Sequence, residues 1–146
     1  MVDFNSIGEM MQGCAADAVG AAQDRFGFVL DYSAASIESL ETVLANISAS
    51  LDLSDKDIVE REVKIWGSYL GETIRRNFGG TWDLIQYPGR AAALPTLVIA
   101  GSQLYPLMKV YRRLTIGESE NIRKFYDLIR TKLRLTHPAE ESYRST

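Results

Sequence analysis

The segment that most constrains the fold of this 146-residue chain is a long amphipathic run that ends at a pair of glycines. Apolar side chains recur at helical spacing between residues 56 and 78, which predicts a helix. Ser54 or Asp55 can cap its start, and Gly79-Gly80 suits its end. At about 100° per residue, the apolar arc covers roughly half of the circumference. The arc consists of Ile58, Val59, Val63, Ile65, Trp66, Tyr69, Leu70 and Ile74.

Polar and charged side chains fall within or beside this apolar arc. Glu62 lies inside it, Arg76 lies at its edge, and Asn77 points the same way as Val59. Glu72 lies just outside, one turn from Arg76, so the two can pair at i,i+4. Because an unpaired buried charge is costly, we favour an internal ion pair that holds the helix in place. The alternative is a pocket whose Glu and Arg side chains hold a ligand or act as an acid–base pair.

Two glycines interrupt the other side of this helix. Gly67 and Gly71 are four residues apart and leave a groove on the backbone, where a second element can approach closely. The candidate for that approach is a helix predicted over residues 5–25, which is rich in small side chains. We favour packing over a binding groove.

The remaining pattern predicts an α+β fold. Further helices are expected from Ser33 to about residue 51, from Pro106 to near residue 117, and from a cap at Ser119. Strands are expected over 28–32, 81–87 and 96–100, with a fourth possible in 101–105. This order is not a regular βαβ alternation, so we expect about five helices packed on a small, mainly antiparallel sheet of three to four strands. Residues 1–135 should form one globular domain, followed by a flexible polar tail at 136–146.

Few side chains are suited to catalysis or to metal binding. The chain has one cysteine, Cys14, and one histidine, His137, so a disulfide, a Cys–His pair and a zinc site are not expected. No glycine-rich phosphate loop occurs. The acids between residues 52 and 57 lack the glycine and the distal glutamate of a calcium loop, which indicates a charged turn. We therefore predict no catalytic residue, no metal ligand and no cofactor, and a protein that is not an enzyme.

Membrane insertion and nucleic-acid binding are also disfavoured. No apolar run approaches the length of about 18 residues that a membrane-spanning helix needs, and no signal peptide is visible, so the cytoplasm is the expected location. Basic residues gather in the C-terminal third, but the aromatic residues among them fall on apolar stripes, and the isoelectric point is about 5.2. Nucleic-acid binding is therefore the weakest of the functional hypotheses.

Charge divides the chain into two unlike parts. Residues 1–57 hold ten acids and two bases, a net charge of −8, whereas residues 58–146 hold nine acids and fourteen bases, a net charge of +5. One interpretation, which we favour, is that the two parts neutralise each other across a shared core. The other is a two-signed surface that attracts a charged protein partner.

The stretch from Trp66 to Trp82 resembles a family of uncharacterised bacterial small domains, of the kind found near polymorphic toxins, with a YLGE…R…GG-W motif. These domains also resemble the chain at Asp31-Tyr32-Ser33 and at the Pro106 helix, so the outline covers residues 28–130. The resemblance implies an immunity or accessory protein without catalytic residues. It also implies that the motif residues fix the corner between helix and strand. Together with Glu62, these structural residues are Tyr69, Gly71, Glu72, Arg76, Gly79, Gly80 and Trp82.

Two functional hypotheses follow. The first is a non-enzymatic protein-interaction protein, in its specific form an immunity protein that neutralises a secreted bacterial toxin. Since many toxins are basic, an acidic surface would steer the two together. The second is a small ligand-binding or enzymatic domain built on Glu62, Glu72 and Arg76. The acids expected to bind a protein partner are Asp24, Asp31, Glu38, Glu41, Asp52, Asp55 and Asp57.

Overall fold

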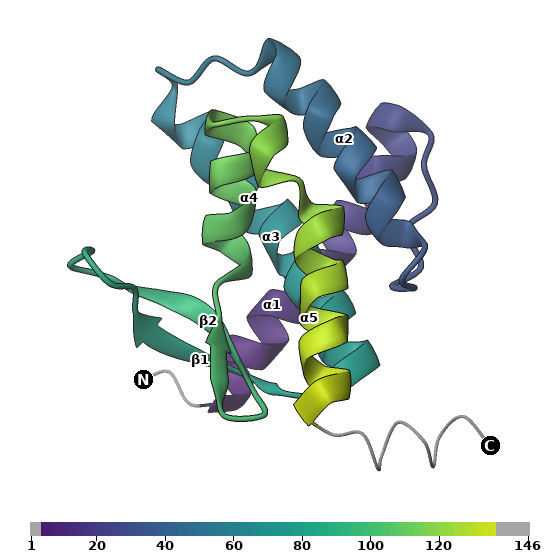
Figure 1. The fold of residues 1–146 in the computed structure, drawn as a ribbon. Helices are drawn as coiled ribbons and strands as arrows, with labels where there is room; N and C mark the ends of the chain where they lie inside the picture. The colour runs from purple at the N-terminus through teal and green to yellow at the C-terminus, as the bar shows by residue number, and fades with distance from the viewer. Residues whose placement is uncertain (1–3, 137–146) are drawn as a thin grey trace.

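A computed structural model describes residues 4–136 and has the predicted α+β class. Within those residues, five α-helices accompany a three-stranded antiparallel sheet (Figure 1). The helices are α1 (Phe4–Ala21), α2 (Ser36–Ser50), α3 (Lys56–Phe78), α4 (Pro106–Thr115) and α5 (Ile122–Thr136). The strands are β1 (Thr81–Gln86), β2 (Ala93–Ile99) and β3 (Ser102–Leu104). A π-helical turn, η1 (Ala22–Phe26), extends α1, and a 3₁₀ turn, η2 (Glu118–Glu120), precedes α5.

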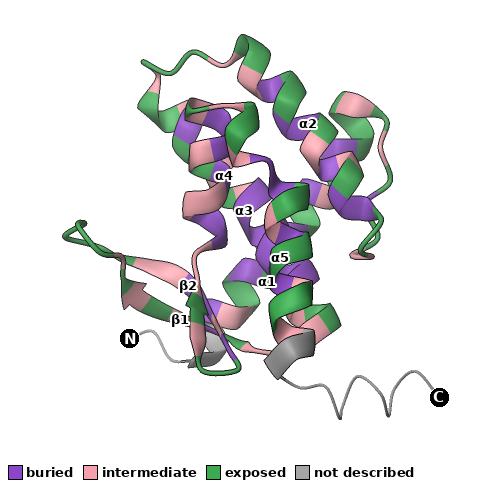
Figure 2. Cartoon of the chain, in the orientation of Figure 1, coloured by how far each residue is buried: buried purple, intermediate pink, exposed green. Residues whose placement is uncertain are grey.

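Helix α3 is the centre of the molecule, and its predicted limits are confirmed. Asp55 caps it by accepting a hydrogen bond from the Ile58 N–H at 3.2 Å, and Gly79 follows its last residue. Every residue from Trp66 to Ile74 is buried, so this part of the helix is covered on all sides. Figure 2 shows this buried segment in the middle of the other helices. Small side chains on α3 make such close coverage possible.

Gly67 and Gly71 do pack closely, but the predicted partner was wrong. A Cβ atom on Gly67 would lie 2.7 Å from Cα of Leu107, and one on Gly71 would clash with the Trp82 ring. The first turn of α4 and the start of β1 therefore occupy the glycine side of α3, which is buried rather than open. Helix α1 packs elsewhere on α3, where the Ser68 hydroxyl contacts Sδ of Met11 at 3.4 Å.

The sheet follows α3 through the glycine pair. Gly79 and Gly80 have φ of 94° and 104°, a backbone region that favours glycine. A Cβ atom on Gly80 would also lie 2.9 Å from the carbonyl oxygen of Val98. In the register β1-β2-β3, Trp82 lies opposite Leu97, and Leu97 lies opposite Leu104. This row carries the buried face of the sheet.

Two local predictions were wrong, namely the strand at 28–32 and the cap of the last helix at Ser119. Residues 28–32 form no strand, because Gly27 ends η1 in a left-handed conformation and Tyr32 has φ of 64°. The third strand is β3, inside the segment 101–105. Asn121, rather than Ser119, caps α5, since its side-chain oxygen accepts from the N–H of Arg123 at 2.8 Å. The predicted tail lies almost entirely outside the described residues.

The packing of Gly71 gives a direct test. Gly71→Ala should lower the free energy of unfolding by about 1–3 kcal/mol, because the methyl group must displace the buried ring of Trp82. Gly13→Ala is the matched control, since nothing lies within 4 Å of a Cβ atom there. It should be neutral or stabilising by about 0.5–1 kcal/mol. Urea unfolding measures both, and equal midpoints for the two variants would contradict the packing described.

Candidate functional site

The carboxylate of Glu72 is the most enclosed charged group in the part of the chain described here. Its side chain is 0% exposed, and it accepts four hydrogen bonds. Arg75 donates from Nε at 2.7 Å and from Nη2 at 3.0 Å, and Trp82 donates from Nε1 at 2.7 Å. The predicted pair with Arg76 is present, but at 3.4 Å it is the longest of the contacts. Glu72 therefore takes part in an internal network.

The protonation of Glu72 follows from this environment. Burial raises the pKa of the carboxyl, but hydrogen bonds from Arg75 and Trp82 and the charges of Arg75 and Arg76 lower it more. The net result is a pKa below the ordinary value of 4.5. The hydrogen bond to Glu72 in turn raises the pKa of Arg75. The pair is thus fully ionised at neutral pH.

Glu62, which lies one helical turn before the buried segment Trp66–Ile74, has the same kind of environment. It is 6% exposed and accepts from Nε1 of Trp66 at 2.6 Å. Arg25, which belongs to η1, donates to both carboxylate oxygens at 2.8 and 3.2 Å. The helical pattern predicted a buried Glu62, but it did not identify Arg25 as its partner.

Arg76, Tyr69 and Asn77 hold the turn that leads into α2. The guanidinium carbon of Arg76 lies 3.6 Å from the ring centre of Tyr32. The Tyr69 hydroxyl accepts from the Tyr32 N–H at 2.8 Å and shares a 2.6 Å hydrogen bond with Ser36. Asn77 is exposed and donates to the Tyr32 carbonyl at 2.9 Å. Because burial dominates, the pKa of Tyr69 is raised.

The residues of the predicted structural motif therefore form two contact groups around α3. Gly71, Glu72, Gly79, Gly80 and Trp82 join α3 to β1, whereas Tyr69 and Arg76 join α3 to the turn at Tyr32. Glu62 is separate, because it lies ten residues before Glu72, or about 15 Å along the helix. The arrangement links helix, strand and turn.

The candidate partner-binding acids do not form one continuous face. Asp31 and Asp52 accept hydrogen bonds from Ser33 and Ser54, which lower their pKa values, and Asp55 caps α3. The other four are Asp24, Glu38, Glu41 and Asp57. Those in segment 52–57 follow the C-terminal end of α2, whereas Asp31 and Glu38 lie near its start. Asp52, Asp55 and Asp57 are thus separated from Asp31 and Glu38 by most of the length of that helix.

Two of these acids join the acidic and basic parts of the chain. Glu41 is largely buried, contacts Arg113 at 2.8 Å and accepts from the N–H of Ile122 at 3.1 Å. Glu38 is exposed and contacts Arg123 at 2.7 Å. These contacts connect α2 to α4 and α5, as expected if the acidic residues 1–57 and the basic residues 58–146 neutralise each other.

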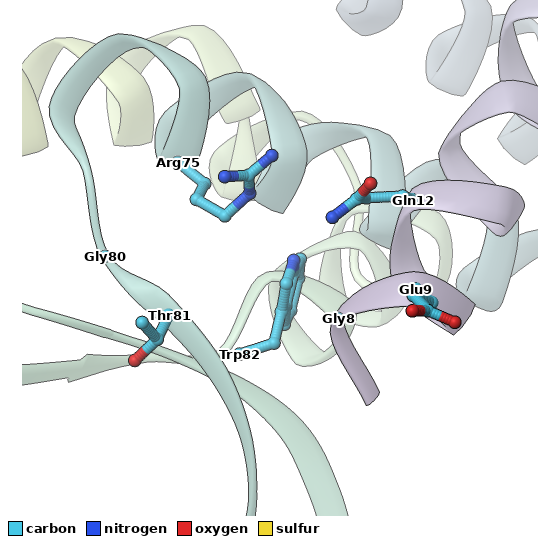
Figure 3. A pocket seen from close by; sticks show the side chains of 7 residues that line it. All are labelled: Gly8, Glu9, Gln12, Arg75, Gly80, Thr81 and Trp82. Atoms are coloured by element: carbon cyan, nitrogen blue, oxygen red, sulfur yellow. The ribbon is translucent and has the colours of Figure 1, made fainter. Parts of the chain in front are cut away.

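Open clefts lie on the surface formed by the described residues, and two of them border candidate site residues. The first, the Arg75 cleft, has a volume of about 590 Å³ and lies between α1, the end of α3 and the start of β1 (Figure 3). The second, the glutamate cleft, has a volume of about 480 Å³ and lies between α2 and the segment from η2 into α5. Its walls include Phe28, Glu38, Glu41, Glu118 and Arg123.

No protein-family model, curated protein or solved structure matches this chain. Within residues 4–136, no group of three His, Cys, Asp or Glu side chains is placed to hold a metal ion. Among the described helices, none combines the length and the apolar character needed to cross a membrane.

Removing the charge of Glu72 should destabilise the protein. Glu72→Gln should lower the free energy of unfolding by about 2–3 kcal/mol, because a buried ion pair is broken while the two arginines can still turn toward water. Glu60→Gln, at an exposed position of the same helix, should change it by less than about 0.5 kcal/mol. Urea unfolding at pH 7 compares the two. A Glu72 variant as stable as the Glu60 variant would contradict the network.

The lowered pKa of Glu72 also predicts a pH dependence. Its contribution to stability is fully present above the ordinary value of 4.5 and is lost as the pH falls through the lower value in the folded protein. Unfolding free energies measured between about pH 6 and pH 3 should therefore decrease more steeply for the wild type than for Glu72→Gln. Parallel curves for the two proteins would show that Glu72 titrates normally.

Proposed function

We propose that this chain is a non-enzymatic protein-interaction module that binds a basic partner, and that it acts as an immunity protein against a bacterial toxin. The observation that carries the proposal is the glutamate cleft. Glu38 and Glu118, whose side chains are 67% and 73% exposed, line one cleft from two different elements, where they contact Arg123 at 2.7 Å and Arg113 at 3.7 Å. A basic side chain of a partner can enter this cleft between them.

The charges around the glutamate cleft support such binding. Glu41 is held by Arg113, so it helps to build the wall rather than to receive a partner. The Glu38–Arg123 pair is exposed, and exposed pairs contribute only about 0–1 kcal/mol, so a partner's arginine can replace Arg123 at low cost. Phe28, which is half-buried, adds an apolar contact at the same cleft. Charge complementarity of this kind mainly accelerates association.

The chemistry of the buried acids supports binding over catalysis. A general acid that works near neutral pH needs a raised pKa, whereas the pKa of Glu72 is lowered. Both Glu62 and Glu72 already accept hydrogen bonds from an arginine and an indole. These groups therefore serve to position α3. The toxin in this proposal comes from the sequence resemblance, and a cytoplasmic location is part of the same proposal.

The proposal predicts a specific, salt-sensitive complex. The chain should bind the secreted protein encoded beside its own gene, measured by surface plasmon resonance with purified proteins, and should protect cells that express that toxin. Neutralising the cleft with Glu38→Gln and Glu118→Gln should slow association about three- to tenfold at low salt, with less difference at high salt. Glu60→Gln, outside the cleft, is the control and should bind like the wild type.

Two outcomes would contradict different parts of this proposal. If no neighbouring secreted protein binds and no toxicity is relieved, the immunity function is wrong. If a partner binds equally well to the wild type and to the double variant, the protein-binding function stands but the glutamate cleft is not its site.

A further inference from the structure

The outer edge of β1 is open. In the order β1-β2-β3, β1 pairs with β2 alone among the described strands, and the end of this hairpin extends away from the helices (Figure 1). Helix α1 lines a cleft together with Thr81 and Trp82, so the open part of the edge begins after them. Leu84 is 43% exposed, and Gln86 is also exposed. An open edge presents unpaired backbone groups to which a strand of another chain can bond.

One backbone N–H on this edge is already occupied. The N–H of Leu84 donates to Oδ1 of Asp83 at 2.8 Å. Leu84 lies opposite Pro95 in the register, and proline, which has no N–H, fits a sheet where its nitrogen points away from the neighbouring strand. In an antiparallel pair of this kind, the two backbone nitrogens point away from each other. The N–H of Leu84 therefore faces the open edge, where Asp83 takes a donor that an added strand would need.

Asp83 is also the only charged residue in the three strands, whose sequences are TWDLIQ, ALPTLVI and SQL. Uncharged segments rich in β-branched and other apolar residues associate readily when their edge is exposed. A charged side chain at such an edge opposes pairing, because its carboxylate would have to lose water. If the β1 strands of two copies paired in antiparallel fashion, their two Asp83 side chains would also repel each other.

We propose that Asp83 protects the β1 edge: its carboxylate holds the outward N–H of Leu84 and so prevents the β1 strand of a second copy from adding to the sheet. The chain can then expose the hairpin and remain a monomer. The glutamate cleft has no part in this inference, which goes beyond the proposed function and does not depend on it.

Removing the carboxylate should open the edge. Asp83→Ala frees the N–H of Leu84, so this variant should dimerise at least about tenfold more strongly than the wild type, measured by sedimentation velocity over a series of concentrations. Asp17→Ala removes the same charge at an exposed position of α1, so it is the matched control and should stay monomeric like the wild type. Asp83→Val, which introduces a strand-favouring residue, repeats the test in case alanine weakens β1.

A second substitution locates the contact. Leu84→Pro removes the outward N–H, and proline should be tolerated there because this N–H bonds to Asp83 rather than to β2. The double variant Asp83→Ala, Leu84→Pro should therefore be monomeric again. In the dimer of Asp83→Ala, the amide of Leu84 should exchange with deuterium more slowly at high protein concentration than at low concentration, because a strand of the second copy then accepts its hydrogen bond.

The proposal is overturned if Asp83→Ala and Asp83→Val both remain folded monomers, or if Asp17→Ala dimerises as strongly as they do. It is also overturned if dimers or precipitates of Asp83→Ala persist when Leu84→Pro is added, because the contact then lies elsewhere. No toxin or other partner enters these measurements, so their outcome is separate from that of the proposed function.

Discussion

A carboxylate inside a protein needs donors around it, and the rest of this structure depends on how α3 meets that need. Glu62 receives one arginine and one indole N–H, and Glu72 receives two arginines, Arg75 and Arg76, and one indole N–H. At Glu62 the arginine comes from η1, and at Glu72 the indole comes from β1. Each acid therefore attaches a separate element to the central helix. Apolar packing alone would tolerate small shifts along α3, but a charged hydrogen-bonded group tolerates few positions, which favours one arrangement of the surrounding elements.

This arrangement in turn requires glycine. The Trp82 indole reaches Glu72 only because Gly71 leaves room for its ring, and because Gly79 and Gly80 allow the chain to reverse at the end of α3. The network and the close packing are therefore one feature of the sequence. Gly71, Glu72, Gly79, Gly80 and Trp82 lie near one another in the chain because they act at one corner, where a helix ends and a strand begins.

Local patterns predicted what depends on local physics. The limits of α3, a cap at Ser54 or Asp55, and the burial of Glu62 all follow from periodicity and capping within the segment itself, and the structure places the cap at Asp55. The partners of the buried acids do not. Arg25 is 37 residues from Glu62, and no periodicity connects them. The error at 28–32 has a similar cause. Apolar side chains there predict a strand, but the backbone of Tyr32 forms hydrogen bonds with side chains of α3 instead of with another strand. Ser119 and Asn121 are both good caps, and only the tertiary position of η2 decides between them.

The division of charge along the chain also serves internal contacts. Glu38 and Glu41 of the acidic part contact Arg123 and Arg113 of the basic part, which joins α2 to α4 and α5. Charged side chains that are already paired in this way have few free donors or acceptors for a ligand. Binding capacity therefore remains where a pair is exposed and weak, as at Glu38. The glutamate cleft lies at such a place, so the proposed protein-binding site follows from a point where the internal network reaches the surface.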